Sequence, residues 1–534
     1  MPEPRGTSRV RIAGTRPAKV AGARRVRAVG PSEVVDVMLL LRNQGALDGS
    51  VFELGSLRVQ DRKHLEPKEL LRRFRADDGD IRAVRRFAAA RRLQVLRVHA
   101  GRRIVVLRGR ARQMTQAFGA ALFHYEHRDH VFRSHEASLT VPKELAGVIS
   151  GVFGLDNRPV AHRPRFAAGA TLTPPPPNPH TKRPSAFRRL YSFPARATGK
   201  RQCVGVLEFG GGFERKKLNA YLSRLGAAAP RIIVREIKPG RNQPANQPGT
   251  LSPDVEVYMD LEILASVAPD ATVVVYFAEN SNRGWVEALH AAIFDAPRLS
   301  VLSISWGQAE EYWDAQTIAA IDAAFQMAAR LGITVCCASG DKGVFEAGHM
   351  PYTVPFPASS PHVLACGGTR LDVLTNGRIK ETVWNESDTV GLASGGGISG
   401  VFGLPPFQNR RDVPARAGKR KSGRGTPDVA ANASSLTGYL IWADETAMSM
   451  GGTSAAAPLW TGLIANLNEA LGLRIGYLTP LLYAGGASRA GGLRDIVRGN
   501  NQMSGRQGYK AHRGWDACTG LGTPHGERLL RWLK

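Results

Sequence analysis

Short apolar runs alternate with helical patterns over residues 203–338, and this alternation constrains the fold more than any other feature of the sequence. The apolar runs cover 203–209, 232–234, 272–277, 300–305 and 334–338, and the helical patterns between them cover 214–225, 254–267, 283–294 and 314–331. Such alternation is typical of a parallel β-sheet with right-handed helical crossovers. Because the runs are apolar without interruption, we expect strands buried on both faces. The sequence therefore predicts an α/β fold in which helices flank a parallel sheet.

A smaller domain is expected ahead of this α/β region. At about 100 to 200 residues per domain, 534 residues leave room for two or three cores. We expect a disordered basic tail over residues 1–28, which lack hydrophobic periodicity. Strand and helix patterns over 29–165 then indicate a small α+β domain with helices on one face of an antiparallel sheet. The α/β region fills residues 187–534.

Residues 166–186 separate these two regions and are rich in proline. They contain TLTPPPPNPHTKRPS, with four consecutive prolines. Such a run favours an extended chain and fits neither a helix nor a central strand. We therefore expect this linker to be extended, exposed to solvent and open to a protease.

The net charge of +27 raises the question of a nucleic-acid partner. Residues 1–185 carry 35 basic and 16 acidic side chains and so hold +19 of that charge. The basic residues there fall in pairs such as Arg72-Arg73 and Arg85-Arg86, without interleaved aromatic residues or a groove-reading motif. This pattern favours a solvated face, with nucleic-acid binding as the alternative.

Neither a membrane span nor an export signal is indicated by the residue pattern. No stretch reaches the roughly 18 uninterrupted apolar residues that a spanning helix needs. The first 30 residues carry positive charge but no apolar run behind it. The five cysteines are irregularly spaced, which favours buried thiols over a disulfide framework or a zinc site.

Three polar or aromatic residues stand where apolar runs end. Glu208 closes CVGVLE, Trp306 follows LSIS, and Asp341 lies just past TVCCAS. In an open α/β sheet, functional groups gather at the carboxyl ends of the strands. The predicted topology therefore brings these three residues to one rim of the sheet.

The segment GGTSAAAP contains Ser454 and precedes a helical pattern that runs to Leu471. Its glycines permit a tight turn, and a serine at the start of a helix lies beside free N–H groups that can stabilise negative charge. Two interpretations stay open at this point: Ser454 or Thr453 caps the helix, or Ser454 is a nucleophile. Pro458 is expected in the first turn, where its missing N–H does no harm.

A nucleophilic serine needs a base, and the carboxylates are better candidates than the histidines. Between the linker and Ser454 the sequence contains three histidines, none of them in a His-Gly-Thr context: His290, His349 and His362. The segment EVYMD places Glu256 and Asp260 four residues apart, on one face of a predicted helix. Such a pair can share a proton, so that one carboxyl accepts the serine proton and the other orients it. A base with a pKa of about 4 to 5 works in acid, where histidine is protonated, so the predicted working range is acidic.

Asp341 in SGDKG offers a second acidic function. A protonated carboxyl can donate a hydrogen bond to an oxyanion, alongside the N–H of Ser454. The alternative is that Asp341 only shapes an Asp-Lys-Gly turn.

Taken together, EVYMD, SGDKG and GGTSAAAP resemble the motifs of the sedolisin family of serine-carboxyl peptidases, and they stand in the family's order. The resemblance covers about residues 30–534 and implies a subtilisin-like catalytic domain behind a small ferredoxin-like prodomain. It implies four catalytic residues: Glu256 as general base, Asp260 as its supporting carboxyl, Ser454 as nucleophile and Asp341 as the acid of the oxyanion hole. Glu208 and Trp306 match positions that extend the family's chain of hydrogen-bonded carboxyls.

By this resemblance, the protein is an acid-acting endopeptidase made as a self-processing proenzyme. Residues 29–165 would be its prodomain, a folding chaperone and inhibitor that sets a basic surface against an acidic rim of the catalytic domain. Residues 166–186 would be the activation linker. We expect a monomer that acts on proteins or peptides, without nucleic-acid or membrane partners, in a secreted or extracytoplasmic location. The rivals are an inactive homologue that binds peptides without cutting them and a basic nucleic-acid protein.

Two segments near the C-terminus, RDIVRGNN and GWDACTG, resemble the calcium loops of the family. The resemblance implies one Ca²⁺, held by the carboxylates of Asp495 and Asp516, the carbonyls of Ile496, His512 and Gly514, and a water. His512 stands where the close relative has glycine. Since it would contribute only its carbonyl, we expect the site to survive unless this position needs left-handed backbone.

The segment SGDKG departs from the family pattern, which commonly has serine after the aspartate. Lys342 occupies that position here. A nearby ammonium would lower the pKa of Asp341 and restrict activity to more acidic pH, provided that it points toward the site.

Overall fold

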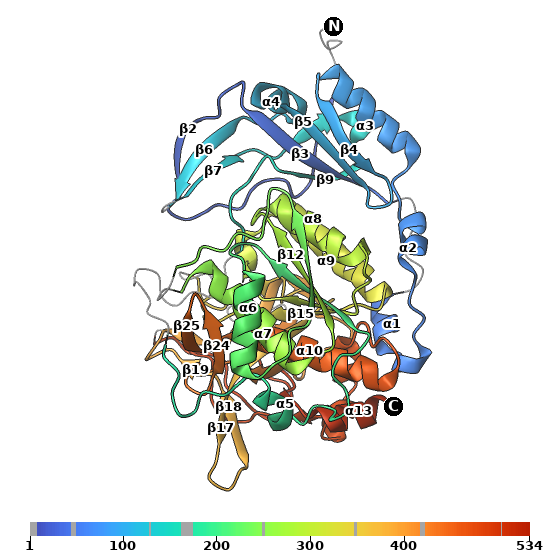
Figure 1. The fold of residues 1–534 in the computed structure, drawn as a ribbon. Coiled ribbons are helices and arrows are strands. Elements are labelled where there is room, and N and C mark those ends of the chain that lie inside the picture. Colours follow the sequence, from blue (N-terminus) through green and yellow to red (C-terminus); the bar gives the residue numbers. More distant parts are fainter. Residues whose placement is uncertain are drawn as a thin grey trace.

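The computed structural model describes residues 8–43, 50–127, 130–161, 175–247, 251–346, 350–416, 422–503 and 505–534. A small N-terminal domain lies at the top of Figure 1, and a larger domain built around a sheet lies below it. None of the helices in these ranges is long and apolar enough to cross a membrane.

An eight-stranded sheet forms the centre of the larger domain. Its strand order is β11-β12-β10-β13-β15-β17-β18, and β23 also pairs with β17. The strands are β10 (Cys203–Glu208), β11 (Arg231–Ile237), β12 (Thr272–Ala278), β13 (Val301–Ile304), β15 (Thr334–Ala338), β17 (Leu364–Val373), β18 (Ile379–Val383) and β23 (Val429–Asn432). Every pairing is parallel except that of β17 with β18. The predicted α/β fold with a parallel sheet is confirmed.

Helices cover both faces of this sheet. One face packs on α7 (Pro253–Val267) and α10 (Thr453–Leu471), with α6 (Arg215–Leu225) outside α7. The other face packs on α8 (Asn282–Phe294) and α9 (Ala315–Arg330). Helix α7 is buried from Asp254 to Val267, because it also contacts α10, α6 and the hairpin strand β24 (Tyr439–Ala443). Its carboxylates therefore lie inside the protein.

The N-terminal domain has the βαββαβ order of a ferredoxin-like fold. Its elements are β3 (Val34–Leu41), α3 (Asp78–Ala90), β4 (Gln94–His99), β5 (Ile104–Arg110), α4 (Ala111–Phe118) and β9 (Ile149–Phe153). The strands form an antiparallel sheet in the order β4-β5-β3-β9. Helices α3 and α4 pack on one face of it, in a single apolar cluster with the strands. This is the predicted α+β arrangement.

The expected disorder of residues 1–28 is wrong for residues 8–28. Strand β1 (Arg9–Arg11) pairs with β8 (Thr140–Pro142), and β2 (Arg24–Ala28) pairs with β6 (Leu122–His127). All five residues of β2 are exposed. Backbone hydrogen bonds therefore hold a strand whose side chains all face water, and such a strand leaves no hydrophobic period in the sequence. Residues 1–7 lie outside the described ranges.

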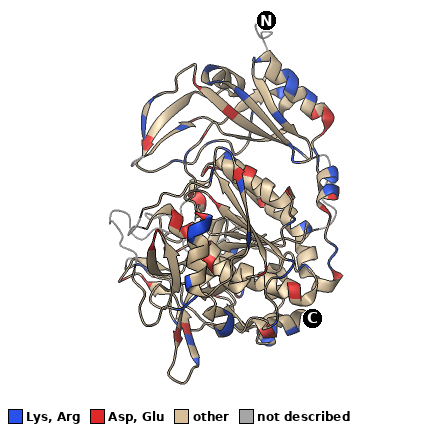
Figure 2. Cartoon of the chain, in the orientation of Figure 1, with Lys and Arg blue, Asp and Glu red and all other residues tan. Residues whose placement is uncertain are grey.

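The second face of the N-terminal sheet packs on the larger domain. Side chains of β3, β5 and β9 belong to the same apolar cluster as those of α8 and α9: Met38, Leu40, Ile104, Val106, Phe153, Trp285, Leu289 and Ile321. At the margin of this contact, Arg97 pairs with Glu287 and Arg102 pairs with Asp295. Figure 2 shows further Lys and Arg on the outer helices α3 and α2 (Pro67–Arg73). A further pair, Arg298 of the larger domain with Glu66, has the opposite polarity, so the contact is mainly apolar with ion pairs of both polarities at its margin.

Residues 175–186, the described part of the proline-rich linker, are bound to the larger domain, and they contain turns at 179–180 and 184–185 in addition to the expected extended backbone. The backbone carbonyl of Lys182 accepts from the N–H of Leu440, and the backbone N–H of Lys182 donates to the carbonyl of Gly438. The carbonyl of Pro175 accepts from the backbone N–H of Ser449. These partners flank and form the hairpin of β24 and β25 (Thr446–Met450), which directly precedes Ser454. Residues 162–174, where the linker begins, lie outside the described ranges.

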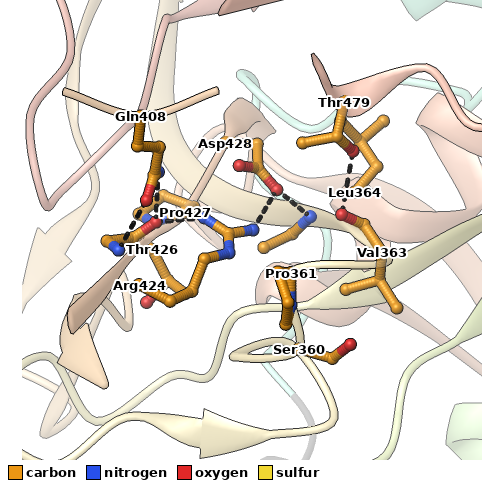
Figure 3. A network of polar contacts seen from close by, with 12 residues as sticks. Ser360, Pro361, Val363, Leu364, Gln408, Arg424, Thr426, Pro427, Asp428 and Thr479 are labelled. Carbon is orange, nitrogen blue, oxygen red and sulfur yellow. Dashed lines mark hydrogen bonds and ion pairs between the residues drawn. The ribbon is translucent and has the colours of Figure 1, made fainter. Parts of the chain in front are cut away.

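A fully buried ion pair joins the sheet to the loop that carries β22 (Gly423–Thr426) (Figure 3). Arg424 Nη2 lies 2.6 Å from Asp428 Oδ2, and both side chains have no exposed surface. The same carboxylate accepts from the N–H of Ala365 at 2.7 Å and from the hydroxyl of Tyr483 at 2.8 Å. Gln408 bonds both the N–H and the carbonyl of the residue after Arg424. The network therefore fixes the start of β17 against the loop before β23.

Replacing Arg424 alone should be strongly destabilising. Arg424→Met leaves Asp428 buried without its cation, which typically costs about 3 to 5 kcal/mol. We expect the double variant Arg424→Met/Asp428→Asn to recover part of that loss. Urea unfolding of the full chain at neutral pH measures both. A loss below about 1 kcal/mol for the single variant, as for an exposed pair, would contradict the prediction.

Candidate active site

The carboxyl ends of β10, β13 and β15 meet at one rim of the sheet, and the residues predicted to lie there do so. Glu208 is the last residue of β10, and Trp306 follows β13. The indole Nε1 of Trp306 donates to Glu208 Oε2 at 3.0 Å. Both side chains are buried. The sequence-predicted pair is thus joined by a direct hydrogen bond.

Helix α7 adds two buried carboxyls to this rim. Glu256 is 6% exposed and Asp260 is fully buried. Burial raises the pKa of Glu208 and of Asp260 well above the ordinary range, and the nearby charge of Glu256 raises both further. Glu208 and Asp260 therefore interact electrostatically with Glu256, and the neutral forms of Glu208 and Asp260 are favoured. Glu262 of the same helix points away from this group and accepts from the N–H of Trp442 at 3.0 Å.

Ser305, which sequence analysis did not single out, connects this group to Ser454. Its Oγ lies 2.9 Å from both carboxyl oxygens of Asp260 and 3.3 Å from the carbonyl oxygen of Ser454. The hydroxyl of Ser454 in turn donates to the carbonyl of Ser305 at 3.3 Å. A neutral Asp260 can donate to Ser305, which frees the Ser305 hydroxyl to donate to Ser454. The signal available in the sequence was its place directly before Trp306, at the same strand end.

Ser454 does not cap its helix. Helix α10 begins at Thr453, and its N-cap is Gly452, which has φ of 90°. Glycine has no side chain that could bond the first turn. Pro458 lies inside the helix, so its expected place in the first turn is wrong. Because proline has no N–H, the carbonyl of Ser454 lacks its usual helical donor. The Ser305 hydroxyl lies within hydrogen-bond distance of that carbonyl.

Asp341 takes the place of a capping side chain. Its Oδ1 accepts from the N–H of Thr453 at 2.8 Å and from the Thr453 hydroxyl at 2.7 Å. Its Oδ2 lies against Gly452, where an added Cβ would be 2.5 Å away, so only glycine fits. Burial raises the pKa of Asp341 to about 6, although the Thr453 hydrogen bonds and the charge of Lys342 oppose the rise. Below that pH, Asp341 is a neutral donor beside the N-terminus of α10.

The two carboxylates of the C-terminal loops converge on residues 512–514. Asp495 Oδ2 accepts from the N–H of Gly514 at 2.9 Å, and Asp516 Oδ2 lies 3.4 Å from the N–H of His512. Asp516 is 1% exposed, and no lysine or arginine of the described ranges pairs with either acid. Gly514 has φ of 83°, whereas His512 is not among the described residues with positive φ. Among described residues no three His, Cys, Asp or Glu side chains gather as a metal cluster, so a cation here would rely on two carboxylates and backbone carbonyls.

Comparison with known proteins gives two family matches along the chain. The family described as Pro-kumamolisin, activation domain, matches residues 21–158, and the Subtilase family matches residues 245–480. Kumamolisin of Bacillus sp. (strain MN-32) is 41% identical over 514 residues, which cover 93% of this chain and 91% of that protein. The chain belongs to the sedolisin family of serine-carboxyl peptidases.

Two further relatives place this sedolisin-family chain in the same group. Sedolisin of Pseudomonas sp. (strain 101) is 29% identical over 538 residues, covering 95% of this chain and 88% of its own length. The structure of Pseudomonas sedolisin (serine-carboxyl proteinase) with two molecules of pseudo-iodotyrostatin is 30% identical, with a TM-score of 0.59, and covers 66% of this chain and 98% of its own. The expected resemblance to the sedolisin family and the expected serine-type peptidase are confirmed.

The buried Asp341 should make stability depend on pH in a defined direction. Because its folded-state pKa is raised from 3.8 to about 6, its contribution is fully present below about pH 4 and is lost as pH rises through about 6. In a Ser454→Ala background, we expect the parent to lose about 2 kcal/mol more than Asp341→Asn between pH 4 and pH 7. Urea unfolding at both pH values measures the difference. Equal pH dependence in the two proteins would refute the prediction.

Proposed function

We propose that the protein is an acid-acting endopeptidase, made as a self-processing proenzyme, in which Ser454 forms an acyl-enzyme. The observation that carries this proposal is the contact chain from Asp260 through Ser305 to Ser454, next to the Asp341 carboxyl. It supports a site in which Ser454, the buried acids and Asp341 act together at one strand rim. Family membership supports the same reaction class.

In this proposal, acids do the proton transfers that histidine performs in other serine peptidases. Ser454 Oγ attacks the peptide carbonyl carbon while its proton passes to Glu256. The tetrahedral oxyanion accepts from the Asp341 carboxyl and the N–H of Ser454. The C–N bond then breaks, and the leaving amine takes the proton from Glu256. Water repeats the sequence on the acyl-enzyme, with Glu256 again as base, to release the carboxylic acid.

The remaining acids have supporting roles. Asp260, largely neutral through burial, orients Glu256 and bonds Ser305. Glu208, held by Trp306, extends the coupled group and keeps its charge low. A shared proton of this kind keeps one base available in acid, where imidazole would be charged.

The domain roles belong to the same proposal. Residues 29–165 act as folding chaperone and inhibitor, 166–186 as the linker that is cut, and 187–534 as the catalytic domain. The shared core between the N-terminal sheet and helices α8 and α9 supports an inhibitory N-terminal domain. We further propose a secreted or extracytoplasmic monomer that acts on proteins or peptides, without nucleic-acid or membrane partners.

Loss of the Ser454 hydroxyl should abolish both activity and self-processing. We expect Ser454→Ala and Glu256→Gln to lose about 10³-fold or more in casein hydrolysis at about pH 4, and the full chain to stay uncut. Ser303→Ala is the matched control, because Ser303 is a buried serine of β13 that lies outside this machinery. Activity and chain size are followed together after acidification.

The outcomes separate the rivals. Equal processing of the parent and Ser454→Ala would point to a contaminating protease and leave the proposal unsupported. A parent chain that binds peptides but neither cuts them nor itself would favour the inactive homologue. A salt-dependent shift of DNA by the full chain would favour the basic nucleic-acid protein.

We also propose that the C-terminal loops hold one Ca²⁺. Asp495 and Asp516 would supply the carboxylates, and Ile496, His512 and Gly514 would supply carbonyls. The buried Asp516 carboxylate and the ordinary backbone of His512 fit such a donor set. The ion would serve to order these loops, since oxygen ligands from separated segments are tied together when calcium binds.

Calcium removal should therefore lower thermal stability. We expect a chelator to lower the Tm of Ser454→Ala by several degrees and to have little effect on the same chain with Asp516→Asn. Asp270→Asn is the control, because Asp270 is an exposed acid that precedes β12 and bonds Thr198, not these loops. Calcium titration by calorimetry gives an independent readout. A Tm that does not respond to the chelator would argue against the site.

A further inference from the structure

Residues 50–66 of the N-terminal domain lie outside its sheets and run along the larger domain as an arm (Figure 1). Val59 of this arm belongs to the apolar core of the larger domain. The buried guanidinium of Arg62 donates to the carbonyls of Ile475 and Tyr477 at 2.6 and 2.8 Å. The N-terminal domain therefore holds the larger domain at two places, through its sheet and through the arm.

His64 of the arm is enclosed by the backbone of the larger domain and by cations. Its ring packs on two glycines, since a Cβ added at Gly332 or at Gly476 would lie 2.7 or 2.6 Å from ring atoms. Its Nε2 is buried and has no hydrogen-bond partner in the described part of the chain. The charges of three arginines act on the ring: Arg62, Arg298 and Arg474. Burial first, and these charges next, lower the pKa of His64 to about 4.

His290 of α8 has similar surroundings where the N-terminal sheet meets the larger domain. It is 1% exposed, and both of its ring nitrogens are buried without a hydrogen-bond partner in the described ranges. Three basic residues of the N-terminal domain act on it: Arg103, Arg102 and His99. Burial first, and these charges next, lower the pKa of His290 to about 3. Burial also lowers the pKa of His99.

The acids of the domain contact pair with arginines and, in the described ranges, with neither of these two rings. The pairs are Glu66 with Arg298, Glu287 with Arg97 and Arg283, and Asp295 with Arg102. A proton on His64 or on His290 would therefore add a positive charge beside other cations, in a place that excludes water.

Opening of the domain contact would return both rings to water, where an imidazole has its ordinary pKa of about 6.5. The open state takes up protons as the pH falls below about 6.5, whereas the closed state takes them up only near pH 4 and pH 3. The contribution of the neutral rings to the closed contact is therefore fully present above about pH 6.5. It declines as the pH falls from there toward 4.

We propose that His64 and His290 are the acid-sensitive groups of the domain contact, and that protonation of their rings loosens the hold of the N-terminal domain and so triggers activation of the proenzyme. This inference deepens the proposed function and rests on the role of residues 29–165 as an inhibitor. It assigns the onset of activation to two histidines that take no part in the reaction itself.

Two amides report opening of the contact, because their hydrogen bonds cross it. The N–H of Leu65 donates to the carbonyl of Arg330 at 2.8 Å, and the N–H of Val152 donates to Gln316 Oε1 at 2.9 Å. Hydrogen exchange of peptides that contain these amides, measured on the full Ser454→Ala chain, gives their protection factors. Between pH 7 and pH 5 we expect the protection factors to fall by about tenfold or more for each histidine that opening exposes.

The variant His64→Gln/His290→Gln should lose most of this pH dependence, because glutamine does not titrate. His525→Gln is the matched control: His525 is a partly buried histidine, and the arginines that act on it belong to its own domain. Protection factors that fall as steeply in the double variant as in the parent would overturn the proposal. If circular dichroism at pH 7 shows that the double variant does not fold, the single variants decide, and an unchanged pH dependence in both would overturn it.

Self-cleavage of the active full chain separates this inference from the proposed function. We expect the pH of half-maximal cleavage rate to drop by on the order of one unit in the double variant. An unchanged midpoint, in a parent that does cut itself, would overturn the link to activation. A parent that stays uncut while its exchange behaves as expected would instead overturn the proposed function and support the acid-sensitive contact.

Discussion

Exclusion of water from carboxyl groups is the constraint on which the candidate site depends. Helix α7 is enclosed by the sheet, α6, α10 and β24, so Asp260 is fully buried and only 6% of Glu256 is exposed. Glu208 joins them from the end of β10. Acids that cannot all ionise retain protons, and retained protons are what an acid-working serine peptidase needs. The packing of the core therefore sets the protonation of the carboxyls at the rim.

At the start of α10, the same residues serve both the helix and the site. An ordinary helix N-terminus is capped by a nearby side chain, but here the cap comes from Asp341, more than a hundred positions earlier in the chain. That contact orients the carboxyl, satisfies the first N–H of the helix, and leaves the Ser454 hydroxyl without a capping role. Because Pro458 has no N–H to donate, the carbonyl oxygen of Ser454 is available to the Ser305 hydroxyl. The contacts that satisfy the free backbone groups at the start of α10 therefore also set the geometry of the site.

Local patterns predicted the features that local physics controls. The apolar runs gave the parallel strands, the four-residue spacing placed Glu256 and Asp260 on one face, and strand ends placed Glu208, Trp306 and Asp341 at one rim. The pattern failed where contacts join distant segments. Strand β2 has only exposed side chains, and the role of Ser305 depends on the contact of α7 and α10 with the end of β13. Hydrophobic period carries no information on such contacts.

The N-terminal sheet uses one face for its own helices and the other for α8 and α9, so a single apolar cluster spans both domains. A cut in the linker would alter none of these contacts. It would turn an intramolecular partner, present at an effective concentration in the millimolar range, into a separate molecule at whatever concentration the solution holds. The cut N-terminal domain would then dissociate on dilution. The fraction of catalytic domain that stays bound to it would depend on the protein concentration as well as on the affinity of the interface.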